Sequence, residues 1–236
     1  MLPNYWEAGH AAKIDVNNFR GHFQYLEQLP DYPYAELCAA LANDKRLEFL
    51  GEDNDFGCVT SQYNGLTVSR DLIDSCYEID FLEGFFGPKL QTMEVLDIGA
   101  GYGRLCHRFM RLYSKARFYN TDTIPVSQDC CRQYLARRGV WNSYVLPPDR
   151  LVPVELAINI HSWPECTRAD IKFWLDKLCG LGVPYLFVVP HPHGVPFYCQ
   201  DGVFSDLIAS AGYNLVHSKE QHPACWPRTF HLYKRG

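Results

Sequence analysis

The chain has 236 residues, of which 47% are hydrophobic and 21% charged, and its formal net charge is −5. It is long enough to bury a sizeable core, and its charge argues against a nucleic-acid backbone as main partner, because proteins that bind one usually present a basic face. It shows no apolar run of about 18 residues and no secretory leader, so we expect no membrane span and a cytoplasmic location.

The first third of the chain is rich in aromatic residues and mostly helical by periodicity. Helices are expected over residues 15–29 and 34–50. The dipeptide Asn64-Gly65 lies between two alternating segments and predicts a β-hairpin over residues 59–69. A helix from Asp71 to about Phe86 should follow. We expect residues 1–70 to form a helical and hairpin extension on the lid or substrate side of a domain over residues 71–236.

The segment from Met93 to Leu105 reads M-E-V-L-D-I-G-A-G-Y-G-R-L. An apolar run meets three glycines and an amphipathic segment follows, which predicts a buried strand, a sharp turn and a helix. Glycine suits such a turn because a Cβ would clash with a ligand lying against the backbone, and the helix N-terminus offers free N–H groups. We expect the ligand to be bound by Asp97, Gly99, Ala100, Gly101 and Gly103.

The spacing of these glycines separates the candidate ligands. The dinucleotide fingerprint G-x-G-x-x-G/A needs a small residue where the chain has Arg104, and a phosphate-binding loop needs Gly-Lys-Ser/Thr. An acidic residue followed by G-x-G-x-G resembles motif I of the class I S-adenosylmethionine (SAM)-dependent methyltransferases. This resemblance implies SAM as the cofactor, and the alternative is a glycine turn without a ligand.

A second expected strand, over residues 116–122, ends in Asp122, which follows Asp97 by 25 residues. An acidic residue at this place in a βαβ unit accepts hydrogen bonds from ribose hydroxyls, and the resemblance implies the same role toward SAM. The alternative is a helix cap, because Asp122 precedes an expected helix over residues 126–138 with Pro125 at its start.

The rest of the chain alternates between strands and helices, which predicts a mostly parallel sheet. Further strands are expected at residues 143–146, 155–160, 184–189, 213–218 and 229–234. Further helices are expected after the capping box of Thr167 and Asp170, closed by Gly180 and Gly182, and over residues 202–211. The order resembles the Rossmann-like class I methyltransferase fold, an α/β fold with a seven-stranded, mostly parallel sheet and helices on both faces.

Local segments resemble one branch of that fold, the sugar O-methyltransferase family. They are D-F-G-C-V-T, V-S-R-D-L-I-D-S-C-Y-E-I-D-F-L, the glycine segment and N-I-H-S-W-P-E, and the resemblance covers about residues 56–236. It implies an enzyme that transfers a methyl group from SAM to a hydroxyl of a sugar or glycosylated small molecule. Alternatives are another small-molecule acceptor (a phenol, carboxylate or nitrogen), a binding module without catalysis, and a nicotinamide oxidoreductase, which Arg104 disfavours. We expect a small-molecule acceptor as partner, with no nucleic acid or membrane, and leave a homo-oligomer open.

Two strand ends carry candidate catalytic side chains, because in this fold the acceptor lies above the carboxyl ends of the fourth and fifth strands. His161 is the first candidate for a general base, since imidazole titrates near neutral pH; a loop histidine bonded to backbone is the alternative. Glu165 could orient His161, bind the acceptor or cap the next helix, and Asn159 is assigned to the cofactor side. The segment N-I-H-S departs from the Asn/Asp-Pro-Pro-Tyr expected of enzymes that methylate nucleobase amines.

His191 and His193 follow the fifth strand as H-x-H, and His191 is the second candidate base. Both rings could reach one metal from an extended strand, but solvated or substrate-bonding histidines are favoured and no metal is predicted. An aromatic floor for a sugar ring is one interpretation of four side chains, with core packing as the other. They are Trp163, Phe197, Tyr198 and Trp226. Ser69-Arg70-Asp71 could contact SAM or acceptor, and a helix cap is the simpler interpretation.

The ten cysteines form no C-x-x-C pair, and several fall on the apolar faces of expected helices. Without an export signal we expect all ten to be reduced, and most to be small buried hydrophobic residues. A zinc site would need ligands clustered at metal spacing, which the sequence does not show.

Overall fold

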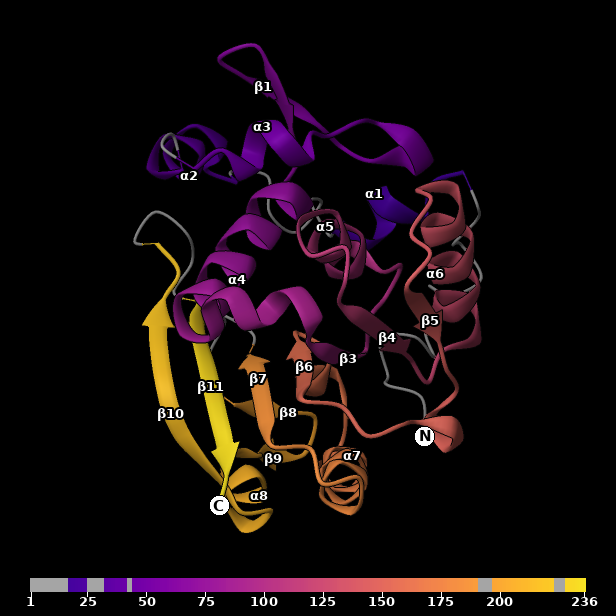
Figure 1. Ribbon diagram of the computed structural model, residues 1–236, viewed down its shortest axis with the longest axis vertical. Coiled ribbons are helices and arrows are strands. Elements are labelled where there is room, and N and C mark those ends of the chain that lie inside the picture. The colour runs from indigo at the N-terminus through magenta and orange to yellow at the C-terminus, as the bar shows by residue number, and fades with distance from the viewer. Residues whose placement is uncertain (1–16, 25–31, 42–43, 191–196, 223–227) are drawn as a thin grey trace.

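The computed structural model describes residues 17–24, 32–41, 44–190, 197–222 and 228–236. A seven-stranded sheet in the order β10-β11-β7-β6-β3-β4-β5 forms its centre (Figure 1). Its strands are β3 (Glu94–Ile98), β4 (Arg117–Thr121), β5 (Ser143–Val145), β6 (Leu156–Ile160), β7 (Tyr185–Val189), β10 (Tyr213–Glu220) and β11 (Thr229–Arg235). Of these, β11 is antiparallel to both of its neighbours, and every other pairing is parallel. The predicted methyltransferase-type sheet, closed by an antiparallel strand, is therefore confirmed.

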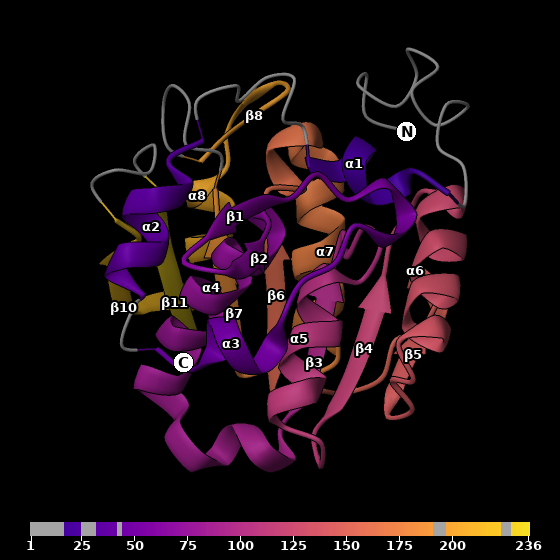
Figure 2. The ribbon, with the colours of Figure 1, turned by 90° about the horizontal axis from the view of Figure 1, so that it is seen from above.

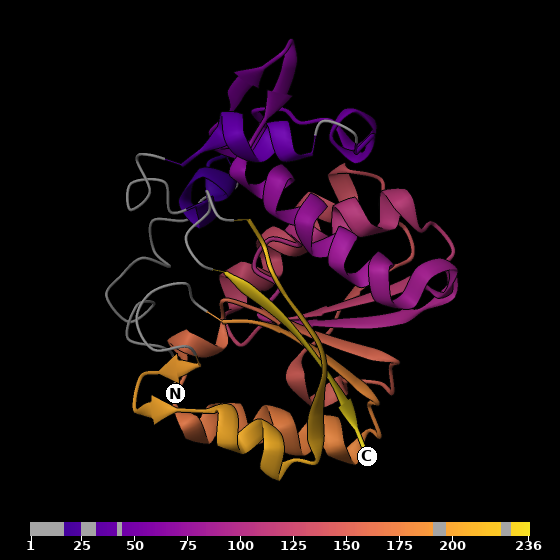
Figure 3. The same cartoon turned by 90° about the vertical axis from the view of Figure 1, so that its left-hand side faces the viewer.

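Helices cover both faces of this sheet, as the side view in Figure 3 shows. One face carries α4 (Arg70–Phe86), α5 (Arg104–Leu112) and α6 (Pro125–Arg137), and the other carries α7 (Arg168–Gly180) and α8 (Ser205–Ser210). The central strands β3, β6 and β7 are mostly apolar and almost entirely buried, because two separate hydrophobic clusters cover them, one on each face. No helix of the described residues is long and apolar enough to cross a membrane.

The shorter elements lie at the N-terminus and in the connections. They are α1 (Phe19–Gln24), α2 (Tyr34–Ala40), α3 (Arg46–Leu50), β1 (Ser61–Tyr63), β2 (Leu66–Val68), β8 (Tyr198–Cys199), β9 (Gly202–Val203) and the 3-10 turns η4 (Asp55–Gly57), η5 (Gly87–Thr92), η6 (Pro148–Arg150) and η7 (Trp163–Glu165). The predicted hairpin is confirmed: β1 and β2 pair antiparallel around Asn64-Gly65, both at positive φ as the turn requires. The predicted capping box of Thr167 and Asp170 at α7 is also confirmed.

Three predicted helices differ from the structure. The helix expected over residues 34–50 is split into α2 and α3, because the Asp44 side chain accepts a hydrogen bond from the backbone N–H of Arg46 and starts a new helix there. Within residues 15–29, the described helix is limited to α1. The helix expected over residues 202–211 begins only at Ser205, because Gly202 and Val203 pair with β8 instead.

The described N-terminal residues lie across α4, α5 and α6, as the view from above shows (Figure 2). Buried charges fasten them there: Glu52 pairs with Arg20 at 2.6 Å and with Arg108 of α5 at 2.7 Å. Asp53 accepts two hydrogen bonds from Arg138, which directly follows α6, at 2.6 and 2.7 Å. Buried ion pairs stabilise only when each charge keeps its partner, so this segment and the helices beneath it depend on one another.

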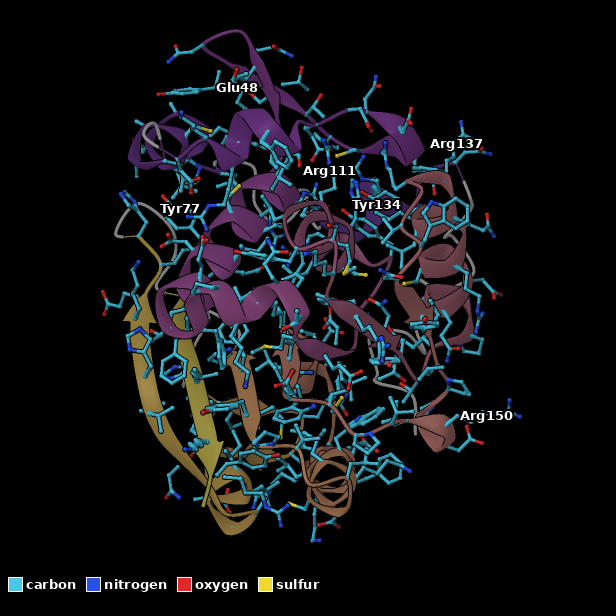
Figure 4. All side chains as sticks on the ribbon, viewed as in Figure 1. Glu48, Tyr77, Arg111, Tyr134, Arg137 and Arg150 are labelled. Atoms are coloured by element: carbon cyan, nitrogen blue, oxygen red, sulfur yellow. The ribbon has the colours of Figure 1, made fainter. Side chains whose placement is uncertain are left out.

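Hydrogen bonds to backbone carbonyls reinforce the contact. Arg111 of α5 donates to the carbonyls of Phe49 and Leu50 in α3, at 3.0 and 2.5 Å. Tyr77 of α4 donates to the carbonyl of Leu37 in α2 at 3.2 Å. Arg111 and Tyr77 both extend toward the N-terminal layer in Figure 4.

The redox state of the cysteines is the first testable prediction. The nine that lie in the described residues are free thiols, and Cys225 lies outside them. Burial raises the pKa of Cys38 to about 11 and the pKa of Cys76 to about 12, so neither forms a thiolate at neutral pH. We expect intact-mass measurement to find ten alkyl groups after alkylation in denaturant without reductant, and far fewer in the native protein. Fewer than ten in denaturant would reveal a disulfide.

Candidate functional site

The candidate site lies at the carboxyl edge of the sheet, where the strand order reverses. From β3 the chain proceeds outward to β4 and β5, and then returns to β6 and β7 on the other side of β3. Ligands of open α/β sheets bind outside the carboxyl ends of the strands at such a reversal. The glycine segment follows β3 directly, and the segment containing His161 follows β6, so two separately predicted groups of residues lie at the same edge.

The glycine loop is tightly fixed to its neighbours. Gly99, Gly101 and Gly103 have φ of 74°, 56° and 84°, in the left-handed region that favours glycine. The N–H groups of Gly99 and Ala100 both donate to the carbonyl of Thr121 at the end of β4, at 2.9 and 3.1 Å. A Cβ on Gly99 would lie 2.2 Å from Oγ of Ser162, so the loop after β6 also requires glycine here.

Tyr102 anchors the middle of this loop and was not singled out from the sequence. Its ring packs against Phe19 of α1 and Tyr134 of α6, with centroids 5.6 and 4.9 Å apart, and Figure 4 labels Tyr134. Its hydroxyl donates to Asp71 at the start of α4. The loop is therefore held by three different elements. A tyrosine between two glycines gives no sign of these partners in the sequence.

Asp97 is the last acidic residue before the loop and is 5% exposed. Its burial raises the pKa of its carboxyl to about 8; Arg104 opposes this shift, and the carboxylates of Glu78 and Asp122 add to it. The side chain is therefore poised to ionise when a cation approaches. Perturbed carboxyls of this kind concentrate at functional sites.

Asp122 is placed beside the glycine loop, as its interpretation as a ribose ligand requires. One oxygen accepts the backbone N–H of Ile124 at 2.9 Å, and the other accepts that of Gly101 at 3.3 Å. The first contact closes an Asx turn just before α6, whose N-cap residue is Ile124 and which has no side-chain cap, so the helix-cap interpretation is not the one the structure shows. Burial raises the pKa of Asp122 to about 6 against these hydrogen bonds.

Arg104, the residue that departs from the dinucleotide fingerprint, is engaged by α4. Its guanidinium donates to both oxygens of Glu78, at 2.7 and 2.9 Å, and to Oγ of Ser75 at 3.0 Å. Burial raises the pKa of Glu78, while the charge of Arg104 favours its ionised form. The sequence shows Glu78 only as one of several acids in a helix, so this pair could not be predicted from it.

Asn159 is fully buried at the end of β6, and both ends of its amide are occupied. Its Nδ2 donates to the carbonyl of Ile98 at 2.9 Å and to Oγ of Ser162 at 2.5 Å. Its Oδ1 accepts the N–H of Trp163 at 3.1 Å. Asn159 thus ties the end of β3 to the loop after β6, which gives it a structural task beside the cofactor role predicted for it.

His161 follows β6 at φ 60°, an unusual conformation for a residue other than glycine. Its backbone N–H donates to the carbonyl of Val189 at the end of β7, at 3.0 Å, and its side chain is half-buried. Residues held in such a conformation cluster at active sites, where surrounding structure compensates the strain. Glu165 lies in η7 of the same loop, and its carbonyl accepts a hydrogen bond from Gln200 at 2.6 Å.

The aromatic floor suggested by the sequence is only partly compatible with the structure. Trp163 is fully buried and packs edge-on against Phe204, so it belongs to the core and that interpretation is wrong for it. Phe197 packs against His231 at 4.8 Å, while Tyr198 is 53% exposed. Trp226, His191 and His193 lie outside the described residues, and no metal-ligating cluster of three side chains occurs within the described ranges.

The segment at the start of α4 forms the helix cap of the simpler interpretation, but its arginine, expected to face solvent, has a side chain that is only 11% exposed. The Ser69 hydroxyl accepts the N–H of Leu72 at 3.0 Å and so caps the helix. Arg70 pairs with Asp74 one turn later, at 3.2 Å. These contacts make the segment part of the scaffold beneath the site.

Comparison with known proteins supports the fold. No family model matches the sequence, and no curated protein is significantly similar to it. Magnesium protoporphyrin IX methyltransferase (ChlM) from Synechocystis PCC 6803 with bound SAH is structurally similar, with TM-score 0.56 and 13% identity over 83% of this chain and 94% of that one. The form of the same enzyme with bound SAM has a TM-score of 0.56 and 12% identity, and the match covers 85% of this chain and 96% of that one. An O-methyltransferase family 2 protein from Planctomyces limnophilus DSM 3776 in complex with apigenin has a TM-score of 0.54 and 14% identity. That match covers 69% of this chain and 56% of the other. The chain thus has the Rossmann-like methyltransferase fold.

Proposed function

We propose that this chain is a SAM-dependent O-methyltransferase that acts on a hydroxyl of a small molecule. The observation that carries the proposal is the fixed glycine loop at the strand-order reversal, with Asp97 before it and Asp122 beside it. The fold similarity to SAM- and SAH-bound methyltransferases supports the cofactor. A sugar or glycosylated acceptor is the class that the sequence resemblance favours, and a cytoplasmic location stays a prediction.

The residues present fit the chemistry of SAM. Its ribose offers two hydroxyl donors, and the carboxylate of Asp122, which lies beside the loop, is an acceptor of the kind that such hydroxyls need. SAM also carries positive charge, which suits a buried carboxyl such as Asp97, to which the described residues bring Arg104 as the opposing cation against two acids. The glycine loop would hold the cofactor between these two side chains, with Gly99, Ala100, Gly101 and Gly103 forming its backbone wall. SAM supplies an activated methyl group with a good leaving group.

The acceptor must then be positioned and deprotonated by the protein. A hydroxyl is a poor nucleophile while it keeps its proton, and a well-placed base typically adds about 10²–10⁴-fold. We assign this role to His161, which the end of β6 fixes next to the loop that meets Gly99. Positioning of the acceptor could supply up to about 7–11 kcal/mol. Glu165 is proposed to orient His161 or bind the acceptor, and His191 is the second candidate base.

A binding test followed by a turnover screen decides the proposal. SAM and its demethylated product SAH should raise the melting temperature, and NAD should not. Incubation with labelled SAM and a panel of sugar nucleotides, glycosides and phenols should then give a methylated product detectable by mass spectrometry. SAM binding without turnover on any acceptor would favour the binding module, and tight NAD binding would exclude the methyltransferase assignment.

Asp122 provides a quantitative test of cofactor binding. Asp122→Ala should weaken SAM binding by about 1–3 kcal/mol, because the ribose loses charge-assisted hydrogen bonds. Since the pKa of Asp122 is about 6, wild-type affinity should also fall as the pH drops below 6 and this carboxylate is protonated. Calorimetry from pH 5 to 8 measures both effects.

Asp122→Asn is the matched control for this test. It keeps an oxygen that can accept from Ile124, and so preserves the turn that precedes α6 while removing the charge. It should fold like the wild type and lose most of the pH dependence below 6. Equal SAM affinity in the wild type and Asp122→Ala would remove this residue from the cofactor site.

A further inference from the structure

Within the described part of the chain, Arg104 is the cation that acts most strongly on Asp97, and it is held in a buried ion pair. Arg104 lies at the first position of α5, directly after the glycine loop. Its two terminal nitrogens donate to the two carboxylate oxygens of Glu78, at 2.7 and 2.9 Å, and one of them also donates to Oγ of Ser75. The side chains of Arg104 and Glu78 are 18% and 2% exposed, so this pair is shielded from water. The charge of Arg104 is therefore largely neutralised by Glu78 of α4.

The charges around Asp97 do not balance among the described residues. Glu78 from α4 and Asp122 from the end of β4 are both acidic, and Arg104 from α5 is the opposing cation. Cys106 and Cys131 face Asp97 from α5 and α6, and burial raises the pKa of both thiols so that they stay neutral. From β6 the neutral amide of Asn159 donates to the carbonyl of Ile98, the residue that follows Asp97.

Asp71 and Asp74 of α4 also act on the charge of Arg104, and each has a further partner of its own. Asp71 accepts from Tyr102, and Asp74 pairs with Arg228 at 2.6 Å and with Arg70 at 3.2 Å. Among the described residues, two acids and one cation thus act on Asp97, and that cation, Arg104, is shared with the acids of α4. A site of this composition favours a ligand that brings positive charge, because an added cation lets Asp97 ionise while a neutral ligand does not.

We propose that Glu78, by holding Arg104, makes the cofactor site select a positively charged ligand, so that the sulfonium donor SAM binds more tightly than its neutral thioether product SAH. Glu78 is then a specificity-determining positioning residue that acts through Arg104. This inference rests on the proposed function. Its consequence for turnover is that transfer of the methyl group, which removes the sulfonium charge, weakens the hold on the product.

Proton release provides a readout that a merely structural role would not change. A cation next to Asp97 favours loss of its proton, so SAM binding near pH 7 should release up to about one proton, and SAH binding should release fewer. The preference for SAM should rise from pH 6 to 9, because at low pH SAM must displace the proton of Asp97 and at high pH the carboxylate is already ionised. Calorimetry in two buffers of different ionisation enthalpy gives the number of protons released and both affinities.

Glu78→Gln is the decisive variant. It frees the charge of Arg104 to act on Asp97, so a preference for SAM on the order of tenfold in the wild type should fall to about onefold. Glu83→Gln is the matched control, because Glu83 lies on the same helix and accepts from Arg46 at 3.1 Å at an exposed position. It should keep the wild-type preference. Glu78→Asp, which keeps the negative charge, should retain part of the preference for SAM over SAH.

Three outcomes would overturn the inference. The first is equal affinity and equal proton release for SAM and SAH in the wild type, which needs no variant and so applies even if Glu78→Gln fails to fold. The second is an equal loss of affinity for both ligands in Glu78→Gln, which would make Glu78 structural only. The third is failure of both ligands to bind the wild type, which would remove the proposed function itself.

Discussion

A His161→Ala variant should lose about 10²-fold or more in kcat while its SAM affinity stays nearly unchanged. A general base acts on the proton of the acceptor and does not contact the cofactor, so its removal affects turnover and leaves cofactor binding intact. The wild-type rate should rise with pH as the imidazole loses its proton. Steady-state kinetics against pH, together with SAM calorimetry, separates these two quantities.

Three controls accompany this experiment. Positive φ at position 161 is strained for any side chain, so His161→Gly tests whether loss of activity follows the ring or the backbone: it should be as inactive as His161→Ala and at least as stable. His191→Ala tests the rival base, and a chelator tests the H-x-H segment. Wild-type kcat in His161→Ala would remove this residue from the mechanism. Activity lost on chelation and restored by a divalent ion would assign the chemistry to a metal.

Gly99→Ala should be the most destabilising single substitution in the cofactor loop. Its Cβ would lie 2.2 Å from Oγ and 2.3 Å from Cβ of Ser162, and φ is 74°. The left-handed conformation costs roughly 1–2 kcal/mol and overpacking about 1–3 kcal/mol, so the free energy of unfolding should fall by about 2–5 kcal/mol. The melting temperature should drop by roughly 4–20 °C, with SAM binding impaired in the fraction that stays folded.

Gly84→Ala is the matched control. Gly84 lies in α4 with a helical φ, and a Cβ there would meet nothing within 4 Å. This substitution should leave the protein as stable as the wild type or raise its stability by up to about 1 kcal/mol. Calorimetric melting of both variants decides the matter, and a Gly99→Ala protein as stable as Gly84→Ala would show that the loop after β6 can move aside.

Features with a local cause could be predicted from the sequence. The hairpin follows from Asn64-Gly65, and the capping box follows from two residues three positions apart, because each pattern satisfies its own backbone. The apolar strands indicated the sheet since burial on both faces leaves few polar positions. The position of Asp122 beside the loop followed from the regular length of a βαβ unit.

Features that depend on distant partners could not be predicted. Tyr102 and Asp71 are 31 residues apart, and Asn159 meets Ile98 across 61. Trp163 shows the same limit, because an aromatic residue next to a candidate base suits a ligand-binding wall and a packed core equally well. The split of the helix expected over residues 34–50 has a local cause, the side chain of Asp44, that competes with an otherwise helical pattern.

The bridge from Arg20 through Glu52 to Arg108 has a consequence for cooperativity. Arg20 is fully buried and Arg108 nearly so, and lifting the described N-terminal segment away would separate Glu52 from Arg108. Breaking one buried pair costs roughly 3–5 kcal/mol, so we expect local opening of this segment to be far rarer than that of a hinged flap. The segment and the helices beneath it should therefore exchange their amide hydrogens at similar rates. We expect access for an acceptor from elsewhere on the carboxyl edge.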